Sequence, residues 1–206
     1  MYKLAIIGFG VVGQGFAEIL LRQRERLANE HGLECSIVAV SDVNKGSAYD
    51  PKGLDPAKLL SLAKDGRISS YPGATTGWNA IDTIKKSNAD VVVEASYTNI
   101  KTGEPAYAHF KAALESGKHV VTTNKGPTAL YFKELAALAR EKGVHFRYEG
   151  SVMSGTPVLN LVEFCLAGND VREIRGILNG TTNFILSNME TGKSYAEALK
   201  EAQDLG

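Results

Sequence analysis

"KLAIIGFGVVG", residues 3–13, is the stretch that decides the fold. A short apolar run, typical of a buried strand, leads into a G-x-G-x-x-G pattern that opens a segment with helical spacing. In such a unit Gly8 permits the tight turn, Gly10 lets the backbone approach a pyrophosphate, and Gly13 lets the helix pack close to the sheet. A tight turn without a ligand is the alternative. We predict a dinucleotide-binding turn formed by Gly8, Phe9, Gly10, Val11, Val12 and Gly13.

Strand-like and helix-like segments alternate up to about residue 150. We expect strands at residues 3–10, 36–43, 89–96, 118–124 and 144–152. We expect helices at residues 11–30, 55–66, 77–87, 103–117 and 126–143. Nearly continuous apolar strands separated by helices are typical of a parallel sheet covered on both faces. The pattern therefore predicts an α/β fold, with a Rossmann-type doubly wound parallel sheet over residues 1–150.

The sequence pattern changes after residue 150. We expect a helix at residues 154–168, a strand leading into a helix within residues 170–192, and a last helix at residues 194–206. Ser194 and Glu197 have the spacing of a capping box at the start of that last helix. Residues 151–206 are thus predicted to form part of a second α/β domain.

Polar residues follow the second and third predicted strands. A carboxylate at the position of Asp42 accepts hydrogen bonds from the adenosine ribose, which favours NAD over NADP. Lys45 offers an alternative, since its ammonium group can receive the 2′-phosphate of NADP, and Asp42 can also be a plain surface residue. Ser96 and Tyr97 end the third strand, where the ligand crevice of such sheets lies, so we expect them beside the nicotinamide. Glu94 is either a paired buried carboxylate or a group of the site.

Lys125 follows the fourth predicted strand in "HVVTTNKGP", residues 119–127. At the end of a parallel strand its ammonium group is expected to point into the same crevice. There it would stabilise an oxygen that gains negative charge during hydride transfer, and it would exchange a proton with that oxygen. A surface lysine at a strand end is the alternative.

Five stretches together resemble the homoserine dehydrogenase family. They are GFGVVG (8–13), VVEASYTNIKTGEPA (92–106), HVVTTNKGP (119–127), YEGSVMSGTPV (148–158) and ILNGTTNFIL (177–186). They occur in the family's order and extend through essentially the whole chain. The resemblance implies NAD- or NADP-dependent interconversion of L-homoserine and L-aspartate 4-semialdehyde, on the route to threonine and methionine.

The resemblance also implies roles for particular residues. Lys125 matches the family's catalytic lysine at cofactor and substrate. A monovalent cation, sodium, would be bound by the side chain of Glu149 and the carbonyl oxygens of Val152, Ser154 and Thr156. Residues 179–184 are expected at the mouth of the active site. Residues 151–206 would belong to a substrate-binding and dimerisation domain, so we expect a homodimer or a larger homo-oligomer.

Family members continue beyond the position of Gly206 with a segment that carries a substrate-binding Glu, an Asp and a second catalytic Lys. We therefore expect a truncated or short form, in which cofactor binding is better supported than turnover. Two alternatives stay open, a non-catalytic NAD(P)-binding module and a dehydrogenase for another amino acid or aldehyde. A phosphorylating aldehyde dehydrogenase needs a nucleophilic cysteine, and neither Cys35 nor Cys165 is expected to be placed for that role.

Composition excludes several classes of partner. The 206 residues include 23 Lys plus Arg and 23 Asp plus Glu, so the formal net charge is zero. This balance argues against nucleic acid or an anionic membrane as the main partner. No apolar stretch approaches the ~20 residues that a membrane span needs. Two distant cysteines in apolar surroundings are typical of reduced core thiols, so we expect a cytoplasmic protein.

Overall fold

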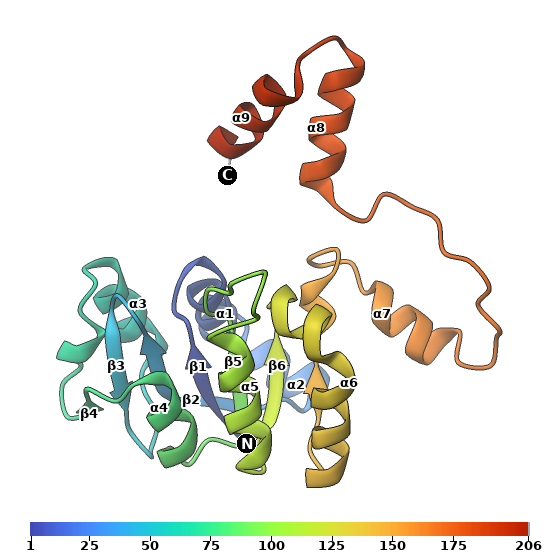
Figure 1. The fold of residues 1–206 in the computed structure, drawn as a ribbon. Helices are drawn as coiled ribbons and strands as arrows, with labels where there is room; N and C mark the ends of the chain where they lie inside the picture. Colours follow the sequence, from blue (N-terminus) through green and yellow to red (C-terminus); the bar gives the residue numbers. More distant parts are fainter. Residues whose placement is uncertain (206) are drawn as a thin grey trace. The chain divides into compact units, whose positions relative to one another are not determined.

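The computed structural model describes residues 1–205 and divides the chain into two compact units. The first unit is Met1–Ser151, and the second begins at Val152. The seven-stranded sheet lies in the first unit, in the order β4-β3-β2-β1-β5-β6-β7 (Figure 1). Its strands are β1 (Tyr2–Ile7), β2 (Cys35–Asp42), β3 (Gly46–Tyr49), β4 (Thr75–Thr76), β5 (Val91–Glu94), β6 (His119–Thr122) and β7 (Phe146–Arg147).

The five predicted strands are present as β1, β2, β5, β6 and β7 and pair in parallel with one another, which confirms the predicted parallel sheet. Two antiparallel strands, β3 and β4, extend the β2 edge and were missed. β3 returns directly from β2 and starts at Gly46, whose φ of 84° makes the tight reversal possible. The predicted strand at residues 144–152 is too long, because β7 has two residues and a 3₁₀ turn, η2 (Glu149–Ser151), follows.

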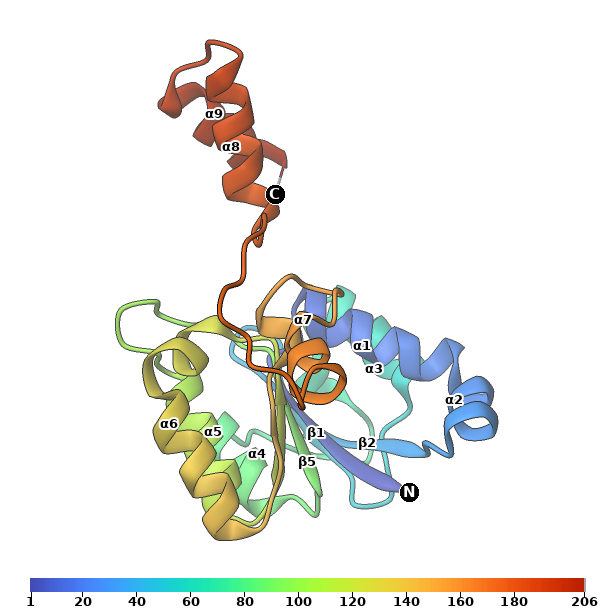
Figure 2. The ribbon, with the colours of Figure 1, turned by 90° about the vertical axis from the view of Figure 1, so that its right-hand side faces the viewer.

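Helices cover both faces of the sheet, which confirms the doubly wound arrangement. Figure 2 shows α4, α5 and α6 on one face and α1, α2 and α3 on the other. Their bounds are α1 (Val11–Arg22), α2 (Arg24–His31), α3 (Pro56–Lys64), α4 (Ala80–Lys86), α5 (Ala106–Glu115) and α6 (Lys125–Lys142), with a 3₁₀ turn η1 (Ile68–Ser70) after α3. The single helix expected over residues 11–30 is wrong, since it breaks at Gln23 into α1 and α2. All residues of α2 are at least partly exposed, so packing against the core does not hold it in line with α1.

The first unit has a hydrophobic cluster on each face of the sheet. Successive residues of a strand point to opposite faces, so Ala5 and Ile7 join one cluster and Ile6 joins the other. Phe110 of α5 is fully buried in the first cluster, and Phe9 of the glycine-rich turn is fully buried in the second. Burial of Phe9 therefore anchors the glycine-rich turn in the hydrophobic core.

The second unit is helical in its described part. Its elements are α7 (Val158–Asn160), a π-helical segment η3 (Leu161–Cys165), α8 (Gly180–Glu190) and α9 (Tyr195–Leu205). α8 and α9 pack together through Ile185, Ala198 and Ala202. The predicted capping box is confirmed, because Ser194 N–H donates to Glu197 Oε2 at 2.9 Å and Glu197 N–H donates to Ser194 Oγ at 3.3 Å. Over residues 1–205, no helix combines the length and apolar character that crossing a lipid bilayer requires.

The strand expected before α8 is wrong: residues 170–179 form no strand in the structure. A strand is stable only when a neighbouring strand completes its hydrogen bonds, and residues 152–205 contain no such neighbour. The helix expected at residues 154–168 is also shorter than predicted and turns π-helical at Leu161.

Candidate dinucleotide-binding site

Close backbone packing explains why two positions of the turn, Gly8 and Gly13, must be glycine. Gly8 has a φ of 88°, and a Cβ atom there would lie 2.5 Å from Ala95 O and Ser96 N. A Cβ on Gly13 would lie 2.3 Å from Gly8 O. Both distances are far inside van der Waals contact, so the strand–turn–helix unit requires glycine at both positions. The close approach of Gly8 to Ala95 and Ser96 also packs the turn against the end of β5.

The third glycine faces open space. Gly10 is the N-cap of α1, and a Cβ atom there would meet nothing within 4 Å among residues 1–205. The first N–H groups of a helix lack intrahelical acceptors and carry the positive end of the helix dipole. Val11 is 91% exposed at this helix start. The turn thus offers donors and room to a phosphate group, and its residues fit a dinucleotide.

Asp42 lies at the end of β2 and holds the turn. Its Oδ2 accepts a hydrogen bond from Phe9 N–H at 2.8 Å. Its Oδ1 accepts from the N–H groups of Asn44 and Lys45, each at 3.0 Å, and the Lys45 ammonium lies 3.7 Å away. Burial raises the pKa of Asp42, but these hydrogen bonds and the Lys45 charge outweigh it, so the net pKa lies below its usual value. An ionised carboxylate therefore stands beside the glycine-rich turn.

The ends of β5 and β6 are neighbours, since Glu94 and Thr122 are partners in the parallel ladder. Ser96 follows β5 and turns its hydroxyl group toward the Glu94 carboxylate, to which it donates a hydrogen bond. Tyr97 is 80% exposed. Lys125 is exposed as well, but it is the first residue of α6 and does not extend β6, which ends earlier than predicted.

Two polar residues near these strand ends, His109 and Asn124, were missed in the sequence, whereas Thr98 lies in the stretch ASYTN (95–99) that was expected at the nicotinamide half. His109 of α5, Asn124 before α6 and Thr98 after β5 are joined to Glu94 or to one another by hydrogen bonds. Glu94 itself is fully buried and paired, one of the two alternatives that its sequence left open. A histidine between apolar residues in "YAHF", residues 107–110, was the signal that pointed to a buried partner.

The predicted cation ligands fall in two different units. Glu149 is in η2 at the end of the first unit, whereas the other three are Val152, Ser154 and Thr156 at the start of the second. Within that start, Met153 and Ser154 have φ values of 56° and 53°, and Thr156 N–H donates to Met153 O at 3.0 Å. This left-handed turn changes the direction of the chain between the predicted carbonyl ligands.

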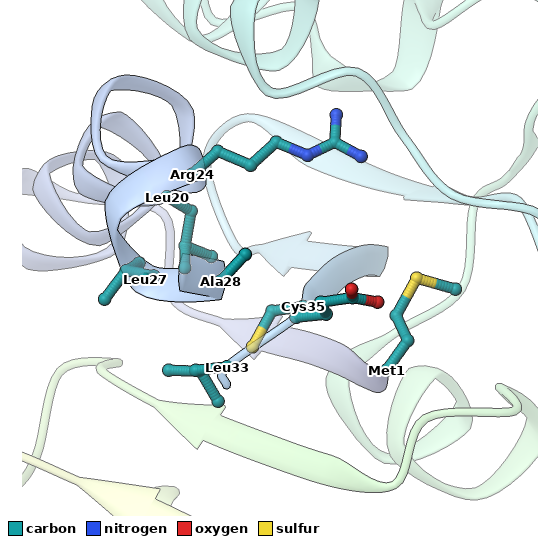
Figure 3. A pocket seen from close by; sticks show the side chains of 8 residues that line it. Met1, Leu20, Arg24, Leu27, Ala28, Leu33 and Cys35 are labelled. Atoms are coloured by element: carbon teal, nitrogen blue, oxygen red, sulfur yellow. The ribbon is translucent and has the colours of Figure 1, made fainter. Parts of the chain in front are cut away.

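A cavity of about 160 Å³ lies at the other end of the strands from the glycine-rich turn. Figure 3 shows Leu20 and Leu27 reaching it from the helices, and Met1 and Cys35 from the starts of β1 and β2. Burial raises the pKa of Cys35, with the amino terminus acting in the opposite direction, so its thiol is a poor nucleophile. Cys165 is exposed in the second unit, so the expectation of a core thiol there is wrong.

Comparison with known proteins assigns both parts of the chain. The family model "Homoserine dehydrogenase, NAD binding domain" matches residues 8–149, and the model "Homoserine dehydrogenase" matches residues 157–206. An NAD(+)-dependent homoserine dehydrogenase of Pseudomonas canavaninivorans is 48% identical over 206 residues, which cover 100% of this chain and 58% of that protein. The homoserine dehydrogenase of Methanocaldococcus jannaschii is 45% identical over 205 residues, which cover 98% of this chain and 60% of that protein.

Solved structures agree with these matches. A hyperthermophilic archaeal homoserine dehydrogenase in complex with NADPH superposes with a TM-score of 0.84 at 28% identity, over 100% of this chain and 61% of that one. The chain thus spans about three fifths of the length of the relatives it matches. On the family models, the sequence identities and the shared fold, the chain belongs to the homoserine dehydrogenase family.

Proposed function

We propose that this chain binds NAD or NADP for the interconversion of L-homoserine and L-aspartate 4-semialdehyde. The observation that carries the proposal is the glycine-rich turn, held by Asp42 through Phe9 N–H, in a chain of the homoserine dehydrogenase family. The N–H groups at the start of α1 would bind the pyrophosphate, and Asp42 would accept hydrogen bonds from the ribose. The bound cofactor would supply or accept the hydride.

Lys125 has the catalytic role in this proposal. Its Nζ would lie beside the substrate oxygen, which is an alcohol in L-homoserine and a carbonyl in the semialdehyde. When the alcohol is oxidised, a hydride leaves its carbon and a proton leaves its oxygen, and the Nζ atom would hold or pass on that proton. In the opposite direction the ammonium group would stabilise the developing alkoxide and protonate it. The exposed position of Lys125 at the start of α6 supports access to a ligand.

A sodium ion and further copies of this chain are the partners in this proposal. A sodium ion would bind Glu149 and the carbonyls of Val152, Ser154 and Thr156, all hard oxygen donors that suit it. We infer a cytoplasmic homodimer or larger homo-oligomer, assembled through the second unit. Exposed apolar side chains of that unit, among them Leu186 of α8 at 60% exposure, support self-association.

The test is NAD- and NADP-dependent oxidation of L-homoserine by the 206-residue chain, with cofactor binding measured by calorimetry on the same sample. Binding together with turnover is the expected result for a dehydrogenase. Binding without turnover would mark the chain as part of a longer enzyme or as the second candidate, a non-catalytic NAD(P)-binding module. Failure to bind either cofactor would contradict both candidates.

Asp42→Ala is expected to weaken NAD binding about tenfold more than NADP binding. The carboxylate has a lowered pKa and is ionised at neutral pH, so it attracts the ribose hydroxyl groups of NAD and repels the 2′-phosphate of NADP. The variant also loses the hydrogen bond to Phe9 N–H, but that loss affects both cofactors alike. The ratio of the two dissociation constants, measured by calorimetry, isolates the ribose contact. An unchanged ratio would show that Asp42 only supports the turn.

A further inference from the structure

A buried network of hydrogen bonds joins the ends of β5 and β6, which lie side by side in the sheet (Figure 1). Glu94, the last residue of β5, is 0% exposed. Its Oε1 accepts from Ser96 N–H at 3.3 Å and from the Ser96 hydroxyl group, and it lies 3.2 Å from His109 Nδ1. Its Oε2 accepts from Asn124 Nδ2 at 3.2 Å. One carboxylate thus receives donors from three separate segments of the chain.

The chemistry of the carboxylate fixes the direction of these bonds. A carboxylate oxygen accepts from the hydroxyl group of Ser96 and the amide group of Asn124, and it accepts from His109 in the tautomer that carries its proton on Nδ1. His109 and Asn124 are each 7% exposed, and water therefore has little access to replace a lost donor. Removing one member leaves a buried polar atom of another without a partner, which makes the network sensitive to single changes.

Asn124 is the member that reaches the site. It is the N-cap of α6, a position where an asparagine side chain normally accepts from an N–H of the first turn. Within residues 1–205 its side chain makes no such bond. The amide group instead donates to Glu94 and, at 3.0 Å, to Ser96 O, and it accepts from the Thr98 hydroxyl group. The side chain therefore connects the start of α6 to the loop after β5 and does not cap its own helix.

The backbone of Asn124 is fixed from both sides. Its N–H donates to Thr122 Oγ1 at 2.8 Å, and its carbonyl accepts from Thr128 Oγ1 at 2.8 Å. Lys125 is the next residue, so the position of its Cα follows from that of Asn124. The loop at residues 96–98 and the start of α6 are held in one fixed relation by the same buried carboxylate.

We propose that Glu94 is a positioning residue, which acts through Asn124 to set Lys125 and the Ser96–Thr98 loop at the nicotinamide half of the cofactor site. This role of Glu94 rests on the proposed function, because only a bound cofactor or substrate would use the geometry that Glu94 maintains. Glu94 itself has no exposed surface, so it would act without contacting the ligand. His109 holds the carboxylate from the side of α5, away from the ligand.

Glu94→Gln tests the proposal with a side chain of the same size. The substitution replaces one of the two accepting oxygens with an NH₂ group, which donates hydrogen bonds. At one oxygen position this NH₂ group would face the donor of Asn124, and at the other it would face Ser96 and His109. Either way, at least one existing hydrogen bond is lost. We expect the dissociation constant for NADH to rise about tenfold in calorimetry. We also expect the NMR amide resonances of Ser96 and Lys125 to shift in the chain without cofactor. If Glu94→Gln does not fold, His109→Ala provides a milder variant. It removes one contact of the Glu94 carboxylate, on the side of α5, and leaves the residues of the site unchanged.

Lys118→Met is the matched control for a loss of stability alone. Lys118 is 8% exposed and directly precedes β6, at the opposite end of that strand from the site. Its Nζ donates to Ser87 O at 2.8 Å and to Ala89 O at 2.7 Å. Its removal breaks buried hydrogen bonds without touching the loops of the site. We expect a lower midpoint of thermal unfolding, with NADH affinity within about twofold of the unmodified chain.

A double-mutant cycle with Asn124→Ala shows whether Glu94 acts through Asn124. We expect the double variant to bind NADH with about the same affinity as whichever single variant binds it less tightly, because both changes break the same connection. Additive losses would overturn the proposal, and so would normal NADH binding by Glu94→Gln. If the unmodified chain bound no NADH, the proposed function would fall together with this inference, whereas normal binding by the Gln variant overturns the inference alone.

Discussion

Lys125→Ala is expected to lower kcat for L-homoserine oxidation by roughly a hundredfold or more, with thermal stability almost unchanged. Lys125 is exposed at the first residue of α6, so truncating its side chain leaves no cavity in the core. In the proposed reaction its ammonium group acts on the oxygen whose charge changes most in the transition state. An interaction that is strongest in the transition state appears in kcat when it is lost.

Lys133→Ala is the matched control for this experiment. Lys133 is also exposed and also lies on α6, so its removal changes the net charge by the same amount. Steady-state kinetics at saturating cofactor should give an unchanged kcat for Lys133→Ala and a strongly reduced one for Lys125→Ala. A normal kcat for the Lys125 variant, in a chain that turns over, would remove this residue from the mechanism.

The first unit could be predicted from sequence because its signals are local. The spacing of Gly8, Gly10 and Gly13 describes a backbone turn, and a turn depends on neighbours a few residues away. Asp55 likewise begins α3 as its N-cap, accepting from Ala57 N–H at 2.8 Å, with Pro56 at the first helical position. Such short-range rules also placed the five parallel strands, and so their alternation with helices was predicted correctly.

The features that were missed depend on partners distant in sequence. The network of the site joins Glu94 to Asn124 across 30 positions, and no pattern along the chain connects the two. The antiparallel strand β3 was hidden in a polar, glycine-containing segment, because its strand character comes from pairing with β2. The strand expected at residues 170–179 failed for the converse reason. Its apolar residues suit a strand, but the described second unit supplies no strand to pair with it.

Gly13→Ala is expected to have the largest effect on the fold, a loss of about 3 kcal/mol or more in the free energy of unfolding. The new Cβ atom would lie 2.3 Å from Gly8 O, and that neighbour is backbone, which cannot move aside like a flexible side chain. To relieve the overlap, α1 has to move away from the turn, and its first N–H groups move with it. Cofactor affinity should therefore fall together with stability, as measured by urea denaturation and calorimetry.

Gly15→Ala and Gly10→Ala separate the two effects within the same segment. A Cβ atom at either position would meet nothing within 4 Å among the described residues. Inside α1, alanine at position 15 should stabilise the fold by about 0.5–1 kcal/mol and leave cofactor binding unchanged. Alanine at position 10 should preserve stability but weaken binding about tenfold or more, because the methyl group occupies the space that the pyrophosphate needs. Normal cofactor affinity in Gly10→Ala would mean that the phosphates do not approach this turn, and the proposed binding mode would have to be abandoned.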